Sequence, residues 1–260
     1  MTNIGLAYLF EYFVLNLFKA YTYRPKIMSK SYLDIILGAI LSQAVYVPVS
    51  ATFLAVFKKS WKWKLSFSLF YFLIENLFLR LKVYAVNWWK PFYSIILLTV
   101  YFFISSVIYR LLLHHKRWAL KIAHYLTMVI IDVNLMYINA VRNKVRFGRG
   151  FHFSWREHFI IAPLYSLFIA FITGLFSRKS GIHFRLLNLL SNQVINLVLM
   201  KKKILKMKLN YILESVLSHL FLVGVSRLLY KKMLSEAIGG VRFEGVSSFN
   251  RYLASRSFYK

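Results

Sequence analysis

Eight apolar segments, separated by short basic connections, constrain the fold of this chain more than any other feature. A membrane-spanning helix needs about 20 mostly apolar residues to cross roughly 30 Å of hydrocarbon. Most of the segments reach that length, and a soluble core could not bury all of them. We therefore predict an all-α, polytopic transmembrane helical bundle of seven or eight helices. The segments are residues 4–20, 33–57, 65–86, 92–113, 118–141, 159–176, 182–200 and 209–230.

Composition agrees with a membrane protein and excludes several kinds of site. Hydrophobic residues make up 59% of the 260 residues, and the mean hydropathy is +0.55. The chain has no cysteine, which excludes disulfides and thiolate metal sites. The histidine pairs lack the one-turn spacing of a zinc site, and the two glycines within residues 147–150 lack the rest of a nucleotide-binding motif. We predict no metal and no cofactor.

The net charge of +27 comes from Lys and Arg residues that cluster at the ends of the apolar segments. There they can meet anionic lipid headgroups, at about 1 kcal/mol each. We predict the lipid bilayer and its anionic lipids as partners, not nucleic acid. Protein partners and a homo-oligomer remain open. Orientation cannot be predicted, because about 18 basic residues lie on one side and 17 on the other.

Tryptophans mark the ends of the apolar segments, and two prolines mark a helix start and a kink. All six tryptophans lie at such ends, where aromatic side chains anchor helices at the membrane interface. Pro91 fits the first turn of its helix, and Pro48 predicts a kink inside residues 33–57. The predicted interfacial anchors are Trp61, Trp63, Trp88, Trp89, Trp118 and Trp155.

Acidic residues inside the apolar segments are the main candidates for function. A carboxylate is expensive in hydrocarbon, so Glu11, Glu75, Asp132 and Glu214 should face partners, a cavity or a water path. Other polar side chains accompany them in the same or neighbouring segments. The predicted intramembrane polar site consists of Glu11, Glu75, Asn76, Arg110, Asp132, Glu214 and His219.

Each candidate also has a purely structural interpretation. Glu75 could accept protons or bind a cation, or it could form a packing contact, for instance with Arg110 on the next helix. Glu214 and His219 are five residues apart, slightly beyond neighbour spacing on a helix, so a relay would need a third group. His124 and Asp132 are two turns apart and are expected to contact other helices. For these last four residues, packing is the favoured interpretation.

The order of motifs suggests an internal repeat with a period of about 115 to 120 residues. Similar strings begin at Pro48 and Pro163, at Asn76 and Asn196, and at Arg110 and Arg227. Chance similarity between Leu- and Phe-rich segments is the alternative. Two parallel four-helix repeats would place one half at residues 1–115 and the other at 116–232, followed by a polar tail at 233–260. Polar residues leave open whether segments 118–141 and 182–200 cross the membrane.

A family resemblance covers the first 115 residues or so. The strings that carry it are Phe10-Glu11-Tyr12, Tyr21-Thr22-Tyr23-Arg24-Pro25-Lys26, Gly38 with Ser42 and Val47-Pro48, and Ile74-Glu75-Asn76-Leu77-Phe78 leading to Asn87-Trp88-Trp89. They resemble an uncharacterised family of small multi-helix membrane proteins of spore-forming Firmicutes, named after a Clostridium botulinum locus. The resemblance implies a bacterial host, and with it a multi-pass location in a bacterial cytoplasmic membrane, but no reaction. The second half departs from the family pattern.

These observations favour an integral membrane protein without catalytic activity that acts through partner or anionic-lipid contacts. The alternative is a proton- or cation-coupled transporter or channel that uses the intramembrane carboxylates. A membrane-embedded lipid-processing enzyme is a second alternative, although no hydrolase or phosphotransfer motif is present.

Overall fold

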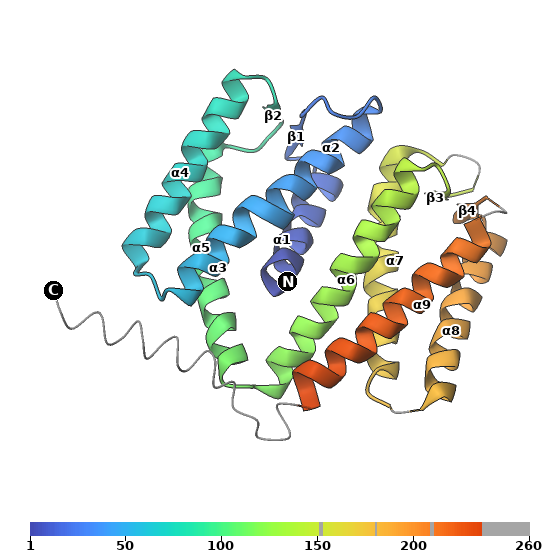
Figure 1. Ribbon diagram of the computed structural model, residues 1–260. Helices are drawn as coiled ribbons and strands as arrows, with labels where there is room; N and C mark the ends of the chain where they lie inside the picture. Colours follow the sequence, from blue (N-terminus) through green and yellow to red (C-terminus); the bar gives the residue numbers. More distant parts are fainter. Residues whose placement is uncertain (151–152, 180, 209–210, 236–260) are drawn as a thin grey trace.

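The computed structural model describes residues 1–150, 153–179, 181–208 and 211–235 (Figure 1). Within them, eight helical segments follow one another, as the apolar segments predict. The predicted tail lies outside the described residues from 236 onward. The segments are α1 (Thr2–Glu11) with η1 (Tyr12–Leu17), α2 (Ser31–Ile40) with η2 (Leu41–Tyr46) and α3 (Val47–Val56), α4 (Trp61–Arg80), α5 (Pro91–Leu113), α6 (Arg117–Val141), α7 (Trp155–Phe176), α8 (Ile182–Lys201), and α9 (Tyr211–Tyr230) with η3 (Lys231–Ser235).

The described part of the chain also contains four strands of three residues each, which form two antiparallel pairs between the helices and which an all-helical prediction missed. Strand β1 (Tyr21–Tyr23) pairs antiparallel with β2 (Tyr84–Val86), and β3 (Val145–Phe147) pairs with β4 (Leu205–Met207). Both pairs lie at the same end of the bundle, at the top of Figure 1. The strands are too short for a period-two pattern, and each pairs with a segment distant in the sequence. We call this end of the molecule the strand end.

The helix before each strand ends without the glycine that often follows the last turn of a helix. In each case a non-glycine residue adopts a positive φ, which closes the helix and redirects the chain. The third helix therefore ends at Arg80 and not at residue 86 as predicted. The redirecting residues are Lys19 (φ 50°), Lys82 (57°), Asn143 (52°) and Lys203 (54°).

The two halves of the chain have the same order of elements: helix, strand, helix, helix, strand, helix. Their strand connections also match in detail. Arg24 N donates to Val83 O at 2.8 Å, and Gly148 N donates to Ile204 O at 2.9 Å, each immediately beside a strand pair. A second matching pair is Asn87 N to Ala20 O (2.8 Å) and Lys208 N to Lys144 O (3.2 Å). By contrast, Pro48 and Pro163 lie at different positions along their helices.

The helices present apolar surfaces outward, as expected of a multi-pass membrane protein. Among the described residues, five helices are long and apolar enough to cross a membrane: residues 31–56, 91–113, 117–141, 155–176 and 211–233. Segment 118–141 is therefore among the candidate spans. Helix α8 does not reach the same hydropathy, yet its three asparagines after Arg185 that lie four residues apart point inward, and leucines dominate its exposed surface. Its buried residues are Asn188, Asn192 and Asn196, and its exposed ones include Leu186, Leu187, Leu190, Val194 and Leu197.

Pro48 lies two residues after a π-helical stretch, within the segment where a kink is predicted. Proline has no amide hydrogen and its ring crowds the carbonyl four residues earlier, so it disturbs the hydrogen bonding of the turn before it. The six residues of η2 immediately before α3 absorb this mismatch, and the helical segment continues to Val56. Pro91 is the first residue of α5, as predicted.

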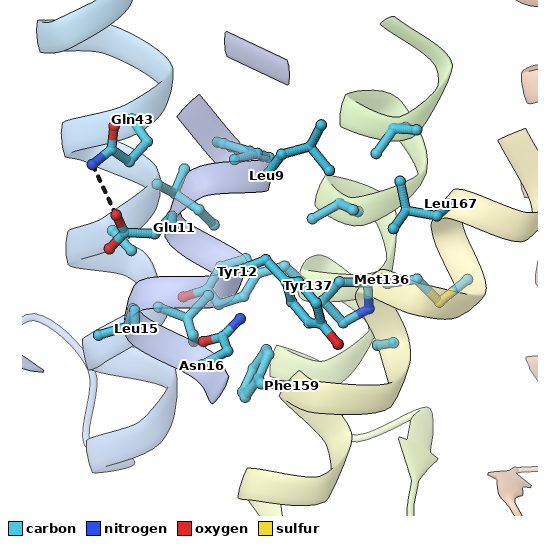
Figure 2. A pocket seen from close by; sticks show the side chains of 18 of the residues that line it. Leu9, Glu11, Tyr12, Leu15, Asn16, Gln43, Met136, Tyr137, Phe159 and Leu167 are labelled. Atoms are coloured by element: carbon cyan, nitrogen blue, oxygen red, sulfur yellow. Dashed lines mark hydrogen bonds between the residues drawn. The ribbon is translucent and has the colours of Figure 1, made fainter. Parts of the chain in front are cut away.

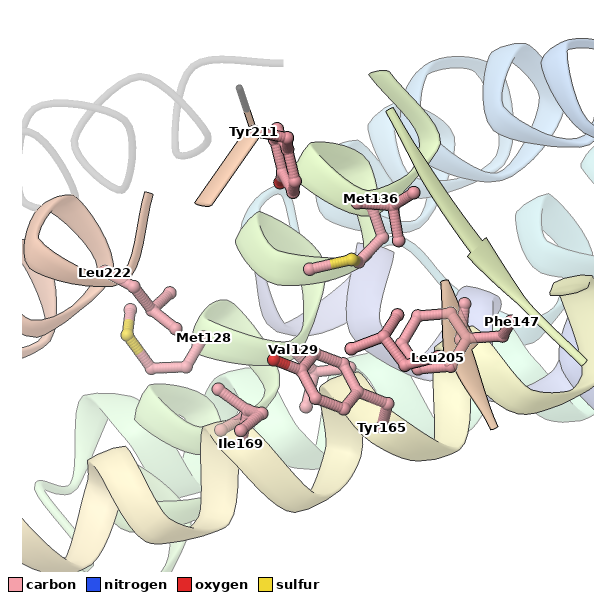
Figure 3. Close-up of a cluster of buried hydrophobic side chains, with 12 residues drawn as sticks. Met128, Val129, Met136, Phe147, Tyr165, Ile169, Leu205, Tyr211 and Leu222 are labelled. Carbon is pink, nitrogen blue, oxygen red and sulfur yellow. The ribbon is translucent and has the colours of Figure 1, made fainter. Parts of the chain in front are cut away.

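The largest buried apolar cluster lies in the second half (Figure 3). Met128 and Met136 of α6 pack with Ile169 of α7, and Phe147 and Leu205 bring the second strand pair into the same cluster. The strands thus insert side chains between the helices instead of lying on the surface.

The tryptophans divide into two kinds. Trp61, Trp63 and Trp118 are about half exposed near helix starts, Trp88 is half exposed in the connection between β2 and α5, and Trp155 is partly exposed at the start of α7. Trp89 differs, because it is only 6% exposed and packs in the cluster around the first strand pair.

Candidate functional site

Glu11 lies at the end of α1, buried between the two halves. Its Oε2 accepts hydrogen bonds from Tyr21 OH at 2.8 Å and from Gln43 Nε2 at 2.9 Å, and Oε1 has no partner. Burial, together with the nearby Glu11 carboxylate, raises the pKa of Tyr21 well above its ordinary value, so the phenol stays a donor. Glu11 is thus a half-satisfied carboxyl group, with one buried oxygen that has no hydrogen-bond partner.

Glu75 does not pair with Arg110. Because α4 and α5 run in opposite directions, Glu75 lies opposite the start of α5, where Ser94 Oγ donates to its Oε2 at 2.5 Å. Arg110 is in the last turn of α5, at the far end of the bundle. Asn76 points back to its own helix and donates to Phe72 O at 2.7 Å. The hydrogen bond between Ser94 and Glu75 joins α4 to α5 and leaves Glu75 Oε1 without a partner.

Asp132 is the most deeply buried acid, at 1% exposure. It lies on α6 beside Ser166 of α7, and its Oδ2 has no hydrogen-bond partner. Among the described residues, the only carboxylate in an ion pair is Glu214. Glu11, Glu75 and Asp132 therefore have no basic side chain to balance a negative charge.

Glu214 does not join the buried polar residues of the predicted intramembrane site. It is in the first turn of α9 at the strand end, and its side chain is 33% exposed. Arg142 Nη1 contacts it at 2.9 Å, and Lys144 pairs with its other oxygen. Its position near the surface explains why both partners reach it. Glu214 and His219 have separate partners and form no relay.

His219 joins three helices in one directed hydrogen-bond chain. Gln193 Nε2 donates to His219 Nδ1 at 2.9 Å, so the neutral ring carries its proton on Nε2, 3.2 Å from Tyr165 OH. The single Tyr165 hydrogen then goes to Asn196 Oδ1 at 2.7 Å, and Asn196 Nδ2 donates to Ser215 Oγ at 3.1 Å. Both ring nitrogens are occupied, so His219 is a packing residue. His124 likewise contacts another helix, at Ser226 O (2.9 Å).

The inward asparagines of α8 were missed as site residues, although their four-residue spacing signals one helix face. Asn188 and Asn196 have partners on neighbouring helices. Asn192, between them, is fully buried, and neither atom of its amide has a partner.

A cavity of about 80 Å³ lies between the two halves (Figure 2). Helices α1, α2 and their π-helical continuations form one wall, and α6 and α7 form the other. The lining is mainly aliphatic and aromatic, with Glu11 and Gln43 on one side and His158 on the other. His158 is fully buried, and its Nδ1 accepts from Phe147 N at 3.0 Å. Its Nε2 therefore carries the proton in the neutral ring and has no partner.

A basic cluster bridges the halves at the strand end. Lys30 Nζ is 2.9 Å from Asn143 Oδ1, and Arg146 Nη2 approaches the same oxygen at 3.4 Å. The Arg146 guanidinium carbon lies 3.1 Å from the ring centre of Trp155, and Lys30 Nζ lies 5.3 Å from it. Burial lowers the pKa of Arg146, and its Nη1 has no partner. Neither cation has a carboxylate within salt-bridge distance among the described residues. We call Lys30, Asn143, Arg146 and Trp155 the basic cluster.

Metal binding finds no support in the part of the chain that the structure describes, where no three His, Asp or Glu residues gather to hold an ion. The comparisons with known proteins give no further assignment. No family model, no curated protein and no solved structure matches this chain.

Proposed function

We propose that this protein is a non-catalytic, multi-pass protein of a bacterial cytoplasmic membrane that binds anionic lipid headgroups between its two halves at the strand end. The basic cluster carries the proposal. Lys30 belongs to the first half, whereas Arg146 and Trp155 belong to the second, so one phosphate group could bridge both halves. Lys30 and Arg146 approach the same oxygen of Asn143, so their positive charges repel each other. A bound anion offsets this repulsion. A guanidinium also matches phosphate oxygens in geometry.

The surroundings of the basic cluster agree with a membrane interface. Trp155 is an aromatic side chain at a helix end, where tryptophan meets headgroups. Lys30 precedes the first turn of α2, which has no side-chain cap, and unsatisfied amides at helix starts favour anions. The chain also carries +27 net charge, which raises the local concentration of anionic lipid.

Lipid retention by the purified protein tests this proposal. We expect native mass spectrometry to detect tighter binding of phosphatidic acid than of phosphatidylcholine, and Lys30→Gln to weaken phosphatidic acid binding about tenfold. Arg146→Gln should have a similar effect. Lys62→Gln removes the same charge at the opposite end of the bundle and should change little. Equal binding by wild type and Lys30→Gln would refute the proposal.

We further propose that the halves are two four-helix repeats with the same orientation relative to the membrane. The support is the shared element order, the matching hydrogen bonds beside the strands and the location of both strand pairs at one end. Parallel repeats of this type often bind ligands between them.

Cation-coupled transport is the second candidate, because Glu11, Glu75 and Asp132 each keep one buried oxygen without a partner. A buried carboxylate without a basic partner takes up a proton or a cation. The test is proton and cation flux into proteoliposomes containing wild type or Glu75→Gln, with thermal unfolding measured for both. Flux that disappears in a well-folded variant supports transport. No flux in either protein argues against it.

A further inference from the structure

Glu11 of α1 and Glu75 of α4 lie on different helices, and the first strand pair joins their surroundings. We infer that these two acids form one proton-binding site, in which both carboxyl groups are protonated at neutral pH and the loss of one proton hinders the loss of the other. The inference deepens the second candidate function by naming the proton as the ion, and it rests on that function only for the step from binding to transport. Proton binding itself can be measured without transport.

Three tyrosines of the first strand pair connect the surroundings of the two acids. Tyr21 and Tyr23 are two residues apart on β1 and share one face of the strand, and Tyr84 of β2 pairs with Tyr23. The ring centres are 5.2 Å apart between Tyr21 and Tyr84, 5.3 Å between Tyr23 and Tyr84, and 5.6 Å between Tyr21 and Tyr23. Tyr21 donates to Glu11, and Tyr84 lies beside Glu75. The two acids therefore share one aromatic environment.

Both acids divide their contacts in the same way. Tyr21 and Gln43 donate to Oε2 of Glu11 (Figure 2), and Ser94 donates to Oε2 of Glu75. Oε1 of each acid is buried and has no partner. An ionised carboxylate carries its charge on both oxygens, so a buried Oε1 without a donor is costly. A proton on Oε1 removes the charge and leaves the hydrogen bonds to Oε2 in place.

Two acids elsewhere in the fold differ in this respect. Asp34 receives backbone amide hydrogens on both of its oxygens, and Glu214 pairs each oxygen with a cation. These partners can only donate, and they reach both oxygens, which favours the ionised form. Glu11 and Glu75 lack this arrangement.

No opposite charge compensates either acid. Among the described residues, no lysine or arginine lies within salt-bridge distance of Glu11 or Glu75. Burial first, and then the charges of both acids, raise the pKa of Tyr23 and Tyr84, so these phenols keep their protons. His158, across the cavity, is a neutral ring whose Nδ1 accepts a backbone hydrogen. The other titratable groups near Glu11 are tyrosines as well: Tyr8, Tyr12, Tyr21 and Tyr137.

The two acids are coupled because the charges of both reach the same two tyrosines, Tyr23 and Tyr84. Like charges repel more strongly in a buried region than in water, so ionisation of one acid favours the proton on the other. A metal ion fits less well, since calcium and magnesium take about six or more oxygen ligands. In the described part of the chain, no three His, Asp or Glu residues gather to hold one. A proton needs neither a ligand shell nor a cavity.

Infrared spectroscopy of the full chain in phosphatidylcholine membranes tests the inference. A protonated carboxyl group absorbs at a higher frequency than a carboxylate. At neutral pH we expect this absorption in wild type, and we expect Glu11→Gln and Glu75→Gln each to lose part of it. Glu214→Gln is the matched control, because an ion-paired acid adds nothing to this absorption. Thermal unfolding of each variant checks that it is folded.

Titration with base tests the coupling, with the double variant Glu11→Gln/Glu75→Gln as the baseline. The last proton of the pair should leave wild type at a pH at least about one unit higher than in either single variant, which lacks the repelling charge. Tyr21→Phe removes a donor that stabilises the ionised form of Glu11, so it should move the loss of that proton to higher pH. Tyr46→Phe, at an exposed position on η2, should leave the titration unchanged.

Four results would overturn the inference. The first is the absence of protonated-carboxyl absorption in wild type at neutral pH, a measurement that requires no variant to fold. The second is equal absorption by wild type and the double variant. The third is a titration of each acid that substitution of the other does not move. The fourth is loss of the absorption on addition of sodium or calcium chloride, which would identify a metal cation as the ligand.

These outcomes also separate the proton site from the proposed functions. Protonated acids without flux in proteoliposomes would reject transport and retain the site. Flux without protonated acids would retain transport and reject the site. Loss of phosphatidic acid binding in Lys30→Gln would affect neither result.

Discussion

Ser94 at the start of α5 donates a hydrogen bond of 2.5 Å to the carboxylate of Glu75 on α4. The same hydroxyl accepts from Trp89 Nε1 at 3.2 Å, so the serine links the first strand connection to the buried acid. In the second half, Asn196 of α8 and Ser215 of α9 form the corresponding contact at 3.1 Å. Each half thus joins its third and fourth helices through a polar side chain and a serine.

This relationship predicts a stability effect for Ser94→Ala. The variant leaves the Glu75 oxygen without its donor, and we expect a loss of about 1–3 kcal/mol in the free energy of unfolding. The double variant Ser94→Ala/Glu75→Leu should recover part of that loss, because it removes the unsatisfied carboxylate, although the Trp89 indole N–H still lacks its acceptor. Thermal unfolding in detergent measures both. Ser106→Ala is the control, since Ser106 bonds only to Phe102 O of its own helix. This account would be contradicted if the loss of stability in the double variant equalled the sum of the losses in the two single variants.

A second effect on stability is predicted for Asp34 at the strand end. Its carboxylate accepts backbone hydrogen bonds from Lys26 (2.9 Å), Ile27 (2.8 Å) and Met28 (2.9 Å), which hold the connection before α2. Asp34→Asn removes the negative charge and replaces one acceptor oxygen with an NH2 group, which cannot accept a hydrogen bond. We therefore expect a loss of about 1.5–3 kcal/mol in unfolding free energy. The matched control is Glu157→Gln in the capping box of α7, which should cost about 0.5–1 kcal/mol. Equal effects would show that the three amides are satisfied in another way.

Much of the helical framework could be predicted, because apolar length and the tryptophan belt are properties of continuous segments. The strands could not, since each has three residues and depends on a partner far away in the chain. The partner of Glu75 was also missed. Charge pairing suggested Arg110, whereas the antiparallel packing of α4 and α5 places Ser94 opposite it. The cavity between the halves requires the packing of helices from both halves, and no local pattern encodes it.

The inward asparagines of α8 provide a comparison within one helix. Asn196 bonds to Tyr165 and Ser215, so Asn196→Leu should lose about 1–3 kcal/mol of stability. Asn192 has no partner for either amide atom, so Asn192→Leu should be neutral or stabilising. Thermal unfolding of the two variants in the same detergent measures the difference in stability between them. Strong destabilisation by Asn192→Leu would instead indicate a bound polar molecule beside α8.

Helix α8 is one of three described helical segments, with α1 and α4, that hydropathy does not identify as spans, and its outward leucines make its membrane contact testable. Leu190 is 59% exposed on the apolar face. The chain has no cysteine, so Leu190→Cys provides the only thiol for labelling. If this face meets lipid, the thiol should react slowly with a membrane-impermeant maleimide, and a nitroxide attached there should collide with oxygen more often than with a water-soluble nickel complex. Lys206→Cys on β4, exposed at the strand end, should show the opposite behaviour. Equally fast reaction at both positions would mean that α8 faces water and that its inward asparagines do not reflect a membrane environment.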